Sequence, residues 1–292
     1  MFVKISNRKR ELNFFLRHCH RKFGNIPKGN FSENIWAWPG VPPKVVFSFF
    51  HRKWESEILD ESRWGLNWMA GLSLAELKLA TQRLPEFFKR MGAVSVAVRI
   101  PMSQHSFVQI VEEAGFIYSG GLVTLSAIPQ ENPTPIKIKK ERLRTAEKKE
   151  QFQLEKIAFS AFKEGRFYHE TGLKEGAAQK IYSAWAKNAV NYADEIWVTG
   201  VKKLTGFVSL KKDKGNKRLW IDLIAVVPRA QGRGLGSILI EKSLESVRQL
   251  KGWTLGVKTE PENLEALRFY LKNSFELESF QLDYIWRKNR QK

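Results

Sequence analysis

AVVPRAQGRGLGSILIEKSL, residues 225–244, places three glycines at alternate positions between an apolar strand pattern and an apolar run of helical period. Glycine adopts positive φ easily and lets a ligand approach the backbone closely. Free amides at the start of a helix, together with the helix dipole, favour an anion. Gly232, Gly234 and Gly236 therefore predict a pyrophosphate site at the start of a helix, and Arg233 adds a mobile positive charge.

Two common phosphate-binding loops do not fit this stretch. A Walker A loop needs Lys followed by Ser or Thr after its last glycine, and no such pair follows Gly236 here. A dinucleotide fingerprint needs the spacing G-x-G-x-x-G, and residues 232–236 are one position short. A tight turn from strand to helix, without a ligand, is the remaining alternative.

Further along the chain, ENLEALRFYLKNSF, residues 262–275, has the pattern of an amphipathic helix. Asn263, Ala266 and Tyr270 share one face, since they stand at positions i, i+3 and i+7. An apolar stripe runs beside them and consists of Leu264, Leu267 and Leu271. We expect the apolar stripe to pack on a sheet and the other face to line the ligand site.

Both stretches resemble motifs of the Gcn5-related N-acetyltransferases (GNAT family). Gln231, Gly234 and Gly236 fill the pattern [QR]-x-x-G-x-[GA], and residues 263–270 fill N-x-x-A-x-x-[FY]-Y. The resemblance implies an α/β fold with a mixed, splayed sheet between helices, acetyl-CoA as acyl donor and no metal. The cofactor-binding residues it implies are Ile224, Ala225, Val226, Gln231, Gly232, Arg233, Gly234, Leu235, Gly236, Asn263, Ala266 and Phe269.

Acyl transfer to an amine needs a neutral amine, a donor for the oxyanion and a proton for the leaving thiolate. Tyr270 is the candidate general acid, because a phenol stays protonated at neutral pH. The resemblance implies a backbone N–H near Ala225 or Val226 as the oxyanion donor. Asp222 is the candidate general base, although strict alternation puts it on one face with Ile224, and a salt-bridged or solvated role is equally compatible. His169 and Glu170 are rival bases.

A second resemblance narrows the range of possible acceptor substrates. Roughly residues 44–290 resemble the dTDP-fucosamine acetyltransferases. It is carried by GRFYHE at residues 165–170, by Y-x-x-W at residues 182–185 and by GFVSL at residues 206–210. It implies a dTDP-linked 4-amino-4,6-dideoxy sugar as the substrate. Residues 165–176 are expected to form a loop, and its candidate substrate-binding residues are Arg166 for phosphate, Phe167 and Tyr168 for stacking, and His169.

The proline-rich stretch PQENPTP, residues 129–135, is the best domain boundary. We expect a smaller α/β domain over residues 44–130 and the acetyltransferase domain over residues 136–292. The two domains share an echo of strand, loop, helix and strand, in which Val111 stands where Tyr270 stands. The first domain is therefore interpreted as a degenerate GNAT-like half, with chance similarity as the alternative.

The chain is basic, with 49 Lys and Arg residues against 30 Asp and Glu residues. The excess is strongest in an N-terminal extension, residues 1–43, which either contacts an anionic membrane face or is a solvated tail. No nucleic-acid-binding signature accompanies it. A single cysteine and no long apolar run predict a cytoplasmic protein, peripheral to the inner membrane at most. A homodimer is a further candidate assembly.

Two other functions remain open at this point. The first is acetylation of a different amine, such as an antibiotic, a polyamine or a protein N-terminus. The second is a non-catalytic module that binds acyl-CoA or a polyanion. A tyrosine at position 270 and an asparagine at position 263 favour an enzyme over this module.

Overall fold

The computed structural model describes residues 2–4, 12, 15, 19, 21–23, 35–38, 44–130, 143–201 and 203–288. The chain divides into two compact units, Met1–Gly121 with Gln281–Lys292, and Leu122–Phe280. The strands β7 (Ile117–Ala127) and β13 (Glu276–Arg287) are each shared between the two units. This division differs from the expected domains 44–130 and 136–292, because the end of the chain supplies a strand to the first unit.

The first unit contains a mixed sheet in the order β1, β3, β4, β5, β6 and β13, with β2 against β5. Its other strands are β1 (Val3–Lys4), β2 (Arg21–Phe23), β3 (Ile35–Trp38), β4 (Val45–His51), β5 (Arg63–Gly71) and β6 (Ser95–Pro101). Strands β5 and β6 pair in parallel, and the remaining pairs are antiparallel.

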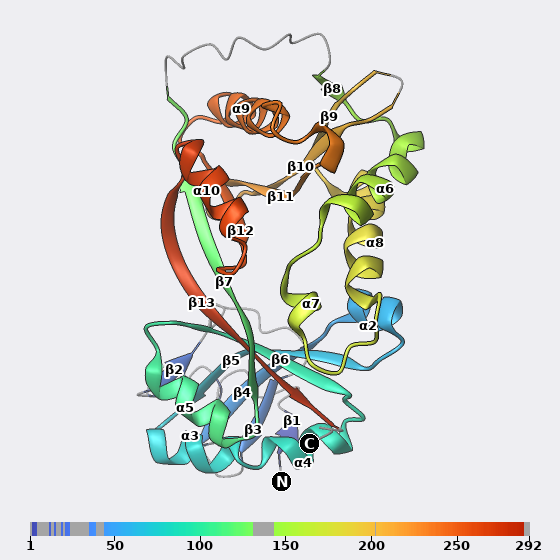
Figure 1. Ribbon diagram of the computed structural model, residues 1–292. Helices are drawn as coiled ribbons and strands as arrows, with labels where there is room; N and C mark the ends of the chain where they lie inside the picture. Colours follow the sequence, from blue (N-terminus) through green and yellow to red (C-terminus); the bar gives the residue numbers. More distant parts are fainter. Residues whose placement is uncertain are drawn as a thin grey trace. The chain divides into compact units, whose positions relative to one another are not determined.

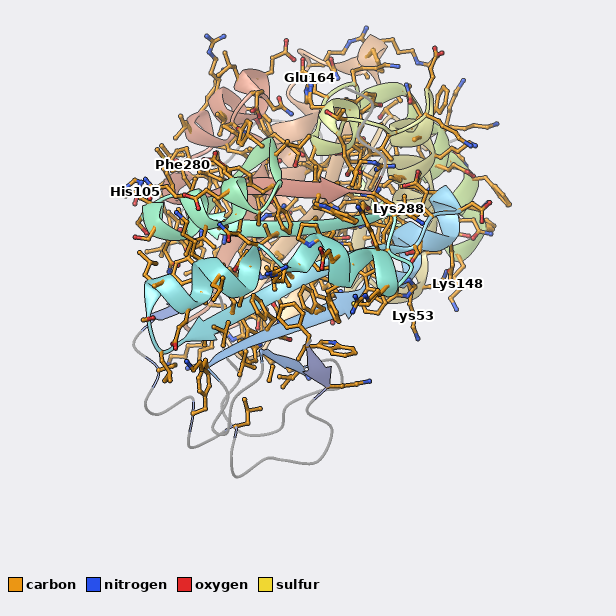
Figure 2. The ribbon with its side chains drawn as sticks, turned by 90° about the horizontal axis from the view of Figure 1, so that it is seen from below. Lys53, His105, Lys148, Glu164, Phe280 and Lys288 are labelled. Atoms are coloured by element: carbon orange, nitrogen blue, oxygen red, sulfur yellow. The ribbon has the colours of Figure 1, made fainter. Side chains whose placement is uncertain are left out.

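The helices of the first unit are α2 (Lys53–Leu59), α3 (Leu74–Thr81), α4 (Leu84–Arg90) and α5 (His105–Glu113). Buried side chains of α3, α4 and α5, such as Leu77, Phe88 and Val111, form one core with the strands. Figure 2 shows this unit from below, with Lys53 at the start of α2 and His105 at the start of α5. A second cluster, around Trp68 and Phe15, is separate from this core.

The second unit contains a sheet in the order β7, β12, β11, β10, β9 and β8. Its strands besides β7 are β8 (Leu143–Thr145), β9 (Glu195–Thr199), β10 (Gly206–Asp213), β11 (Arg218–Val226) and β12 (Thr254–Thr259). Strands β11 and β12 pair in parallel, whereas their other neighbours are antiparallel. A mixed sheet of this kind agrees with the expected fold class.

Helices cover both faces of this second sheet (Figure 1). They are α6 (Gln151–Ala161), α7 (Arg166–His169), α8 (Ala177–Tyr192), α9 (Leu235–Arg248) and α10 (Leu264–Lys272). Side chains of α9 and α10, among them Leu239 and Tyr270, share a core with Val208 and Leu219. Side chains of α6 and α8 share another core with Phe207 of β10. Short 3-10 helices span Lys148–Glu150 and Pro228–Ala230.

The two units repeat one order of elements. The first runs β5, α3, α4, β6, α5 and β7, and the second runs β11, α9, β12, α10 and β13. The repeat supports the interpretation of the first unit as a degenerate half. At the position of the glycine loop (Gly232–Gly236) of the second unit, the first unit has Ser73, whose Oγ accepts the Glu76 N–H at 3.2 Å and caps α3.

Candidate active site

The sheet of the second unit opens between β11 and β12. Their parallel ladder runs from Arg218–Thr254 to Ile221–Val257, after which β12 remains paired with β7 as far as Thr259. Strand β11 carries a bulge at Asp222, because Leu210 pairs with Ile221 while Ser209 pairs with Leu223. A bulge bends its strand and increases the local twist. The final residues of β11 therefore keep β10 on one side and leave their other backbone edge open to a ligand.

The glycine loop follows directly at the end of β11. Gly232 has φ +73° and Gly234 has φ +76°, conformations that side chains with a Cβ rarely adopt. Gly234 is the N-cap of α9, so the first amides of a 14-residue helix lie next to the loop. The Gln231 side chain donates from Nε2 to the Val226 carbonyl at 3.1 Å and ties the loop to the strand.

A cavity of about 450 Å³ joins the open edge of β11, the glycine loop and α10. It is lined by Ala161, Phe162, Ile224, Ala225, Val226, Ala230, Gln231, Gly232, Gly234, Leu235, Gly236, Ser237, Asn263, Glu265, Ala266, Phe269, Tyr270 and Lys272. Gly236 must be small here, since a Cβ would stand 3.0 Å from the Phe269 ring. Asn263 Oδ1 accepts the Ala266 N–H at 3.0 Å and caps α10.

Every cofactor-binding residue expected from the sequence lines this cavity except Arg233, which is exposed. Asn263, Ala266 and Tyr270 share one wall, as their spacing predicted. The apolar stripe beside them was predicted wrongly. Leu264 and Leu271 are 56% and 48% exposed, because Tyr270 and Phe275 fill the space against the sheet with the partly buried Leu267.

Tyr270 is buried and lines the cavity. Burial raises the pKa of its phenol above the ordinary value, and the nearby charge of Glu260 raises it further. The phenol is therefore neutral at every pH at which the protein would be assayed. Its proton remains transferable, because a thiolate formed in the same cavity is also disfavoured by desolvation.

Asp222 does not share a face with Ile224, contrary to strict alternation, because the bulge changes the direction of the side chains. Its Oδ2 accepts a hydrogen bond from Trp185 Nε1 at 2.9 Å and another from the Tyr192 hydroxyl at 2.8 Å. Both donors belong to α8, whereas Ile224 packs towards α9 and α10. Asp222 thus anchors α8 to β11. Burial raises the pKa of the Tyr192 phenol, and the Asp222 carboxylate raises it further.

We expect Asp222→Ala to lower the free energy of unfolding by about 2 kcal/mol, since it leaves two donors without their acceptor. Asp213→Ala, which removes an acceptor in the exposed β10–β11 turn, is the control and should cost about 0.5 kcal/mol. Urea-induced unfolding measures both. Unchanged stability with turnover lost would instead identify Asp222 as the base.

Residues 166–169 form the short helix α7, whereas the sequence predicts a loop there. Phe167 is buried and packs edge-on against Tyr182 of α8, with ring centroids 5.9 Å apart. The Tyr168 ring stacks on Tyr182 at 6.0 Å, and its hydroxyl donates to the Phe162 carbonyl at 2.7 Å. These interior contacts of the two aromatic side chains explain why the segment is ordered as a turn of helix.

The aromatic residues around Tyr182 form a continuous group, which we call the aromatic wall: Phe162, Phe167, Tyr168, Tyr182 and Trp185. Phe162 also lines the cavity, so the wall begins at the cavity and leads along α8. The guanidinium of Arg166 lies 4.2 Å from the Phe167 ring centroid. His169 is exposed, and Glu170 is buried.

Sequence reasoning missed Glu260, which follows the last residue of β12. Its Oε1 accepts the Arg166 backbone N–H at 3.1 Å, and its carboxylate hydrogen-bonds with the Tyr182 hydroxyl. Burial and Glu260 together raise the pKa of Tyr182 above its ordinary value. One signal was available, because ligands often bind beyond the carboxyl ends of parallel strands.

The comparisons with known proteins agree with this geometry. Residues 155–275 match the model of the Acetyltransferase (GNAT) family. The spore coat polysaccharide biosynthesis protein SpsD of Bacillus subtilis is 24% identical over 242 residues, which are 80% of this chain and 81% of SpsD.

Two solved structures share the fold. A tandem GNAT protein from the clavulanic acid biosynthesis pathway has a TM-score of 0.63 at 11% identity and covers 100% of this chain and 99% of its own. A GCN5-related N-acetyltransferase from Sphaerobacter thermophilus has a TM-score of 0.60 at 12% identity. The match covers 88% of this chain and 81% of that protein. The match to a tandem protein along the whole chain supports the repeat seen in the two units.

Most of the basic extension lies outside the described residues, so its membrane contact stays a prediction, as does the homodimer. Within the described ranges, no group of three His, Cys, Asp or Glu side chains could hold a metal ion. No helix in the described part of the chain is long and apolar enough to cross a membrane.

Proposed function

Residues 155–275 form an acetyltransferase domain of the GNAT family, and on that premise we propose that this chain transfers the acetyl group of acetyl-CoA to the amine of a nucleotide-linked amino sugar. The single observation that carries the acetyl-donor part is the cavity. It brings together the open edge of β11, the glycine loop and a buried tyrosine. These are the three features that a pyrophosphate, an extended thiol arm and a leaving thiolate require.

In this proposal acetyl-CoA is a substrate held by the cavity. The amides of Gly232–Gly236 and of the start of α9 receive the pyrophosphate, since they are free donors at the positive end of a helix dipole. The extended arm lies along Ile224–Val226, where it takes the place of a neighbouring strand. A backbone N–H of Ala225 or Val226 then stabilises the oxyanion.

Tyr270 supplies the proton that the leaving sulfur needs. The nitrogen of the acceptor forms a bond to the acetyl carbon, and the C–S bond breaks with its electron pair on sulfur. Donation from the Tyr270 hydroxyl neutralises that sulfur in a site where its charge would be poorly solvated.

The acceptor is proposed from the aromatic wall and from SpsD. Aromatic side chains suit the flat faces of a base and a sugar, and Arg166 suits a phosphate. Phe167 and Tyr182 are buried and Tyr168 packs on Tyr182, so the half-buried Trp185 is the better stacking residue of the wall. SpsD is named for polysaccharide biosynthesis, which supports an activated amino sugar as the substrate class. The proposed sugar is a dTDP-linked 4-amino-4,6-dideoxyhexose.

The test of this proposal is thiol release from acetyl-CoA against a panel of acceptors. The panel holds dTDP- and UDP-linked 4-amino-4,6-dideoxyhexoses, a polyamine, an aminoglycoside and a peptide N-terminus. Turnover with one dTDP-amino sugar alone is the expected result. Turnover with only a non-sugar amine would overturn the substrate class, and tight CoA binding without turnover would favour the non-catalytic module.

Gly232→Ala should weaken acetyl-CoA binding about tenfold, because the added methyl group strains the loop and stands at the cavity. Gly252→Ala is the matched control: both glycines have positive φ, +73° and +76°, and neither has an atom within 4 Å of an added Cβ. Gly252 lies outside the cavity, in the loop between α9 and β12. Each substitution should cost about 1 kcal/mol of stability. Calorimetric titration with acetyl-CoA compares the two variants. Equal Kd values would show that the glycine loop is not part of the binding site.

A further inference from the structure

The mechanism above has no general base, and the environment of Glu260 offers one. Glu260 stands at the carboxyl end of β12, beyond the point at which β11 and β12 separate. It follows the strand directly, so the rigid sheet fixes its backbone. Val226 is the last β11 residue that pairs with β10, and the glycine loop begins six residues later, at the same end of the parallel pair β11 and β12.

Two elements of the second unit contact the Glu260 carboxylate, and a third carries a phenol that its charge influences. From α7, the Arg166 backbone N–H donates to Oε1 at 3.1 Å. From α8, the Tyr182 hydroxyl hydrogen-bonds with the carboxylate. From α10, Tyr270 lies close enough for the charge of Glu260 to raise the pKa of its phenol. Glu260 therefore contacts the aromatic wall, where the acceptor is placed, and its charge acts on the candidate general acid.

The backbone around Glu260 is built to admit this arrangement. Gly165 has φ +137°, and a Cβ there would overlap the Tyr182 hydroxyl and lie 3.2 Å from Glu260 Oε1. Only glycine lets α7 approach so closely. Arg166 of α7 and Tyr182 of α8 thus contact the carboxylate, and the Tyr270 phenol of α10 is influenced by its charge.

The other candidate bases are placed less well. Both hydrogen bonds to Asp222 come from α8 and hold that helix to the sheet. His169 is exposed at the end of α7. Glu265 lines the cavity but is exposed in the first turn of α10. Glu260 is partly buried, and its contacts come from both α7 and α8.

We propose that Glu260 is the general base of the transfer, an inference that rests on the proposed function. Its carboxylate takes a proton from the acceptor ammonium ion and so supplies the neutral amine, while Tyr182 holds the carboxylate in place. As the C–N bond forms, the C–S bond breaks with its electron pair on sulfur, and sulfur takes the Tyr270 proton. The acetylated nitrogen then returns its second proton to Tyr270, and Glu260 releases the first to solvent, so ammonium ion and thioester give amide, thiol and one proton with no net change at the protein.

The test compares Glu260→Gln with the wild type and with Glu276→Gln, an exposed carboxylate at the start of β13. Glutamine keeps an oxygen for the Arg166 N–H, so the fold and the Kd of acetyl-CoA should not change. Turnover should fall about 100-fold at about pH 7. Glu276→Gln should match the wild type.

The pH dependence of the Glu260→Gln effect distinguishes a general base from a purely structural residue. A base matters most where the acceptor arrives as an ammonium ion, and less where solution has already deprotonated it. The ratio of wild-type to Glu260→Gln kcat/KM should therefore shrink by at least tenfold between about pH 7 and about pH 9.5. A ratio that is constant with pH, or full activity of the variant, would overturn the proposal.

A failure of the proposed role of Glu260 can be told apart from a failure of the proposed sugar substrate. The comparison is run with whichever amine the wild type acetylates. Loss of turnover on a non-sugar amine would keep Glu260 as the base and reject the sugar, whereas an active variant on a dTDP-amino sugar would do the reverse. A wild type that acetylates no amine in the panel would overturn both.

Discussion

Tyr270→Phe should lower turnover by about 100-fold or more and leave the affinity for acetyl-CoA almost unchanged. The ring packs in a core with Phe269 and Phe275, at centroid distances of 5.3 Å and 5.4 Å, and phenylalanine keeps those contacts. Only the hydroxyl is removed, and with it the proton for the leaving sulfur. The loss should therefore appear in kcat, while the Kd measured by calorimetry stays within about twofold.

Tyr284→Phe is the control for this substitution. Tyr284 is also a buried tyrosine, and its hydroxyl donates to Glu112 at 2.7 Å, but both residues belong to the first unit. The variant should lose about 1 kcal/mol of stability and keep its turnover. If Tyr270→Phe turned over as fast as the wild type, Tyr270 would have no part in the chemistry.

Gly165→Ala should lower the free energy of unfolding by about 3 kcal/mol and abolish most activity. A Cβ at this position would overlap the Tyr182 hydroxyl and lie 2.9 Å from Tyr182 Cζ. Its φ of +137° adds backbone strain, since this region of conformational space is open almost only to glycine. Relief of the clash must displace either α7 or Tyr182, and both moves disturb the environment of Glu260.

Gly176→Ala isolates the backbone effect. Gly176 also has positive φ, +77°, and an added Cβ there meets no atom within 4 Å. This variant should lose about 1 kcal/mol and remain active. Urea-induced unfolding and steady-state turnover measure both variants, and equal losses would show that the contact with Tyr182 has no importance.

The conformation of the glycine loop and the helix after β12 were the structural features that the sequence predicted best. Their geometry is local, because Gly232 and Gly234 set φ and the spacing of Asn263, Ala266 and Tyr270 sets a helix face. Such features depend on neighbouring residues along the chain rather than on tertiary packing. The same locality explains why one family could be suspected from short motifs.

Features that depend on tertiary packing were predicted poorly. The bulge at Asp222 arises from the register between β10 and β11, and alternation alone cannot reveal it. Phe167 and Tyr168 were expected to face a substrate, yet both pack against Tyr182 of another helix. The amphipathic pattern of α10 also gave a wrong prediction of its buried side. Tyr270 is buried there, whereas Leu264 and Leu271 are exposed.

Glu260 shows the same limit. It is one of 30 acidic residues in the sequence, and its neighbours Arg166 and Tyr182 lie far away along the chain. Only the fold brings α7 and α8 to the end of β12. The sequence also did not predict that the end of the chain supplies a strand to the first unit. The pairing of residues 281–287 with β6 joins positions that are remote in sequence.

The central claim is that the cavity beside β11 holds acetyl-CoA with its sulfur at Tyr270. A crystal structure of the protein with acetyl-CoA tests it most directly. The account predicts the pyrophosphate on the amides of Gly232–Gly236, the thiol arm along Ile224–Val226 and the sulfur within hydrogen-bond reach of the Tyr270 hydroxyl. A pyrophosphate bound elsewhere, or a sulfur directed away from Tyr270, would contradict it.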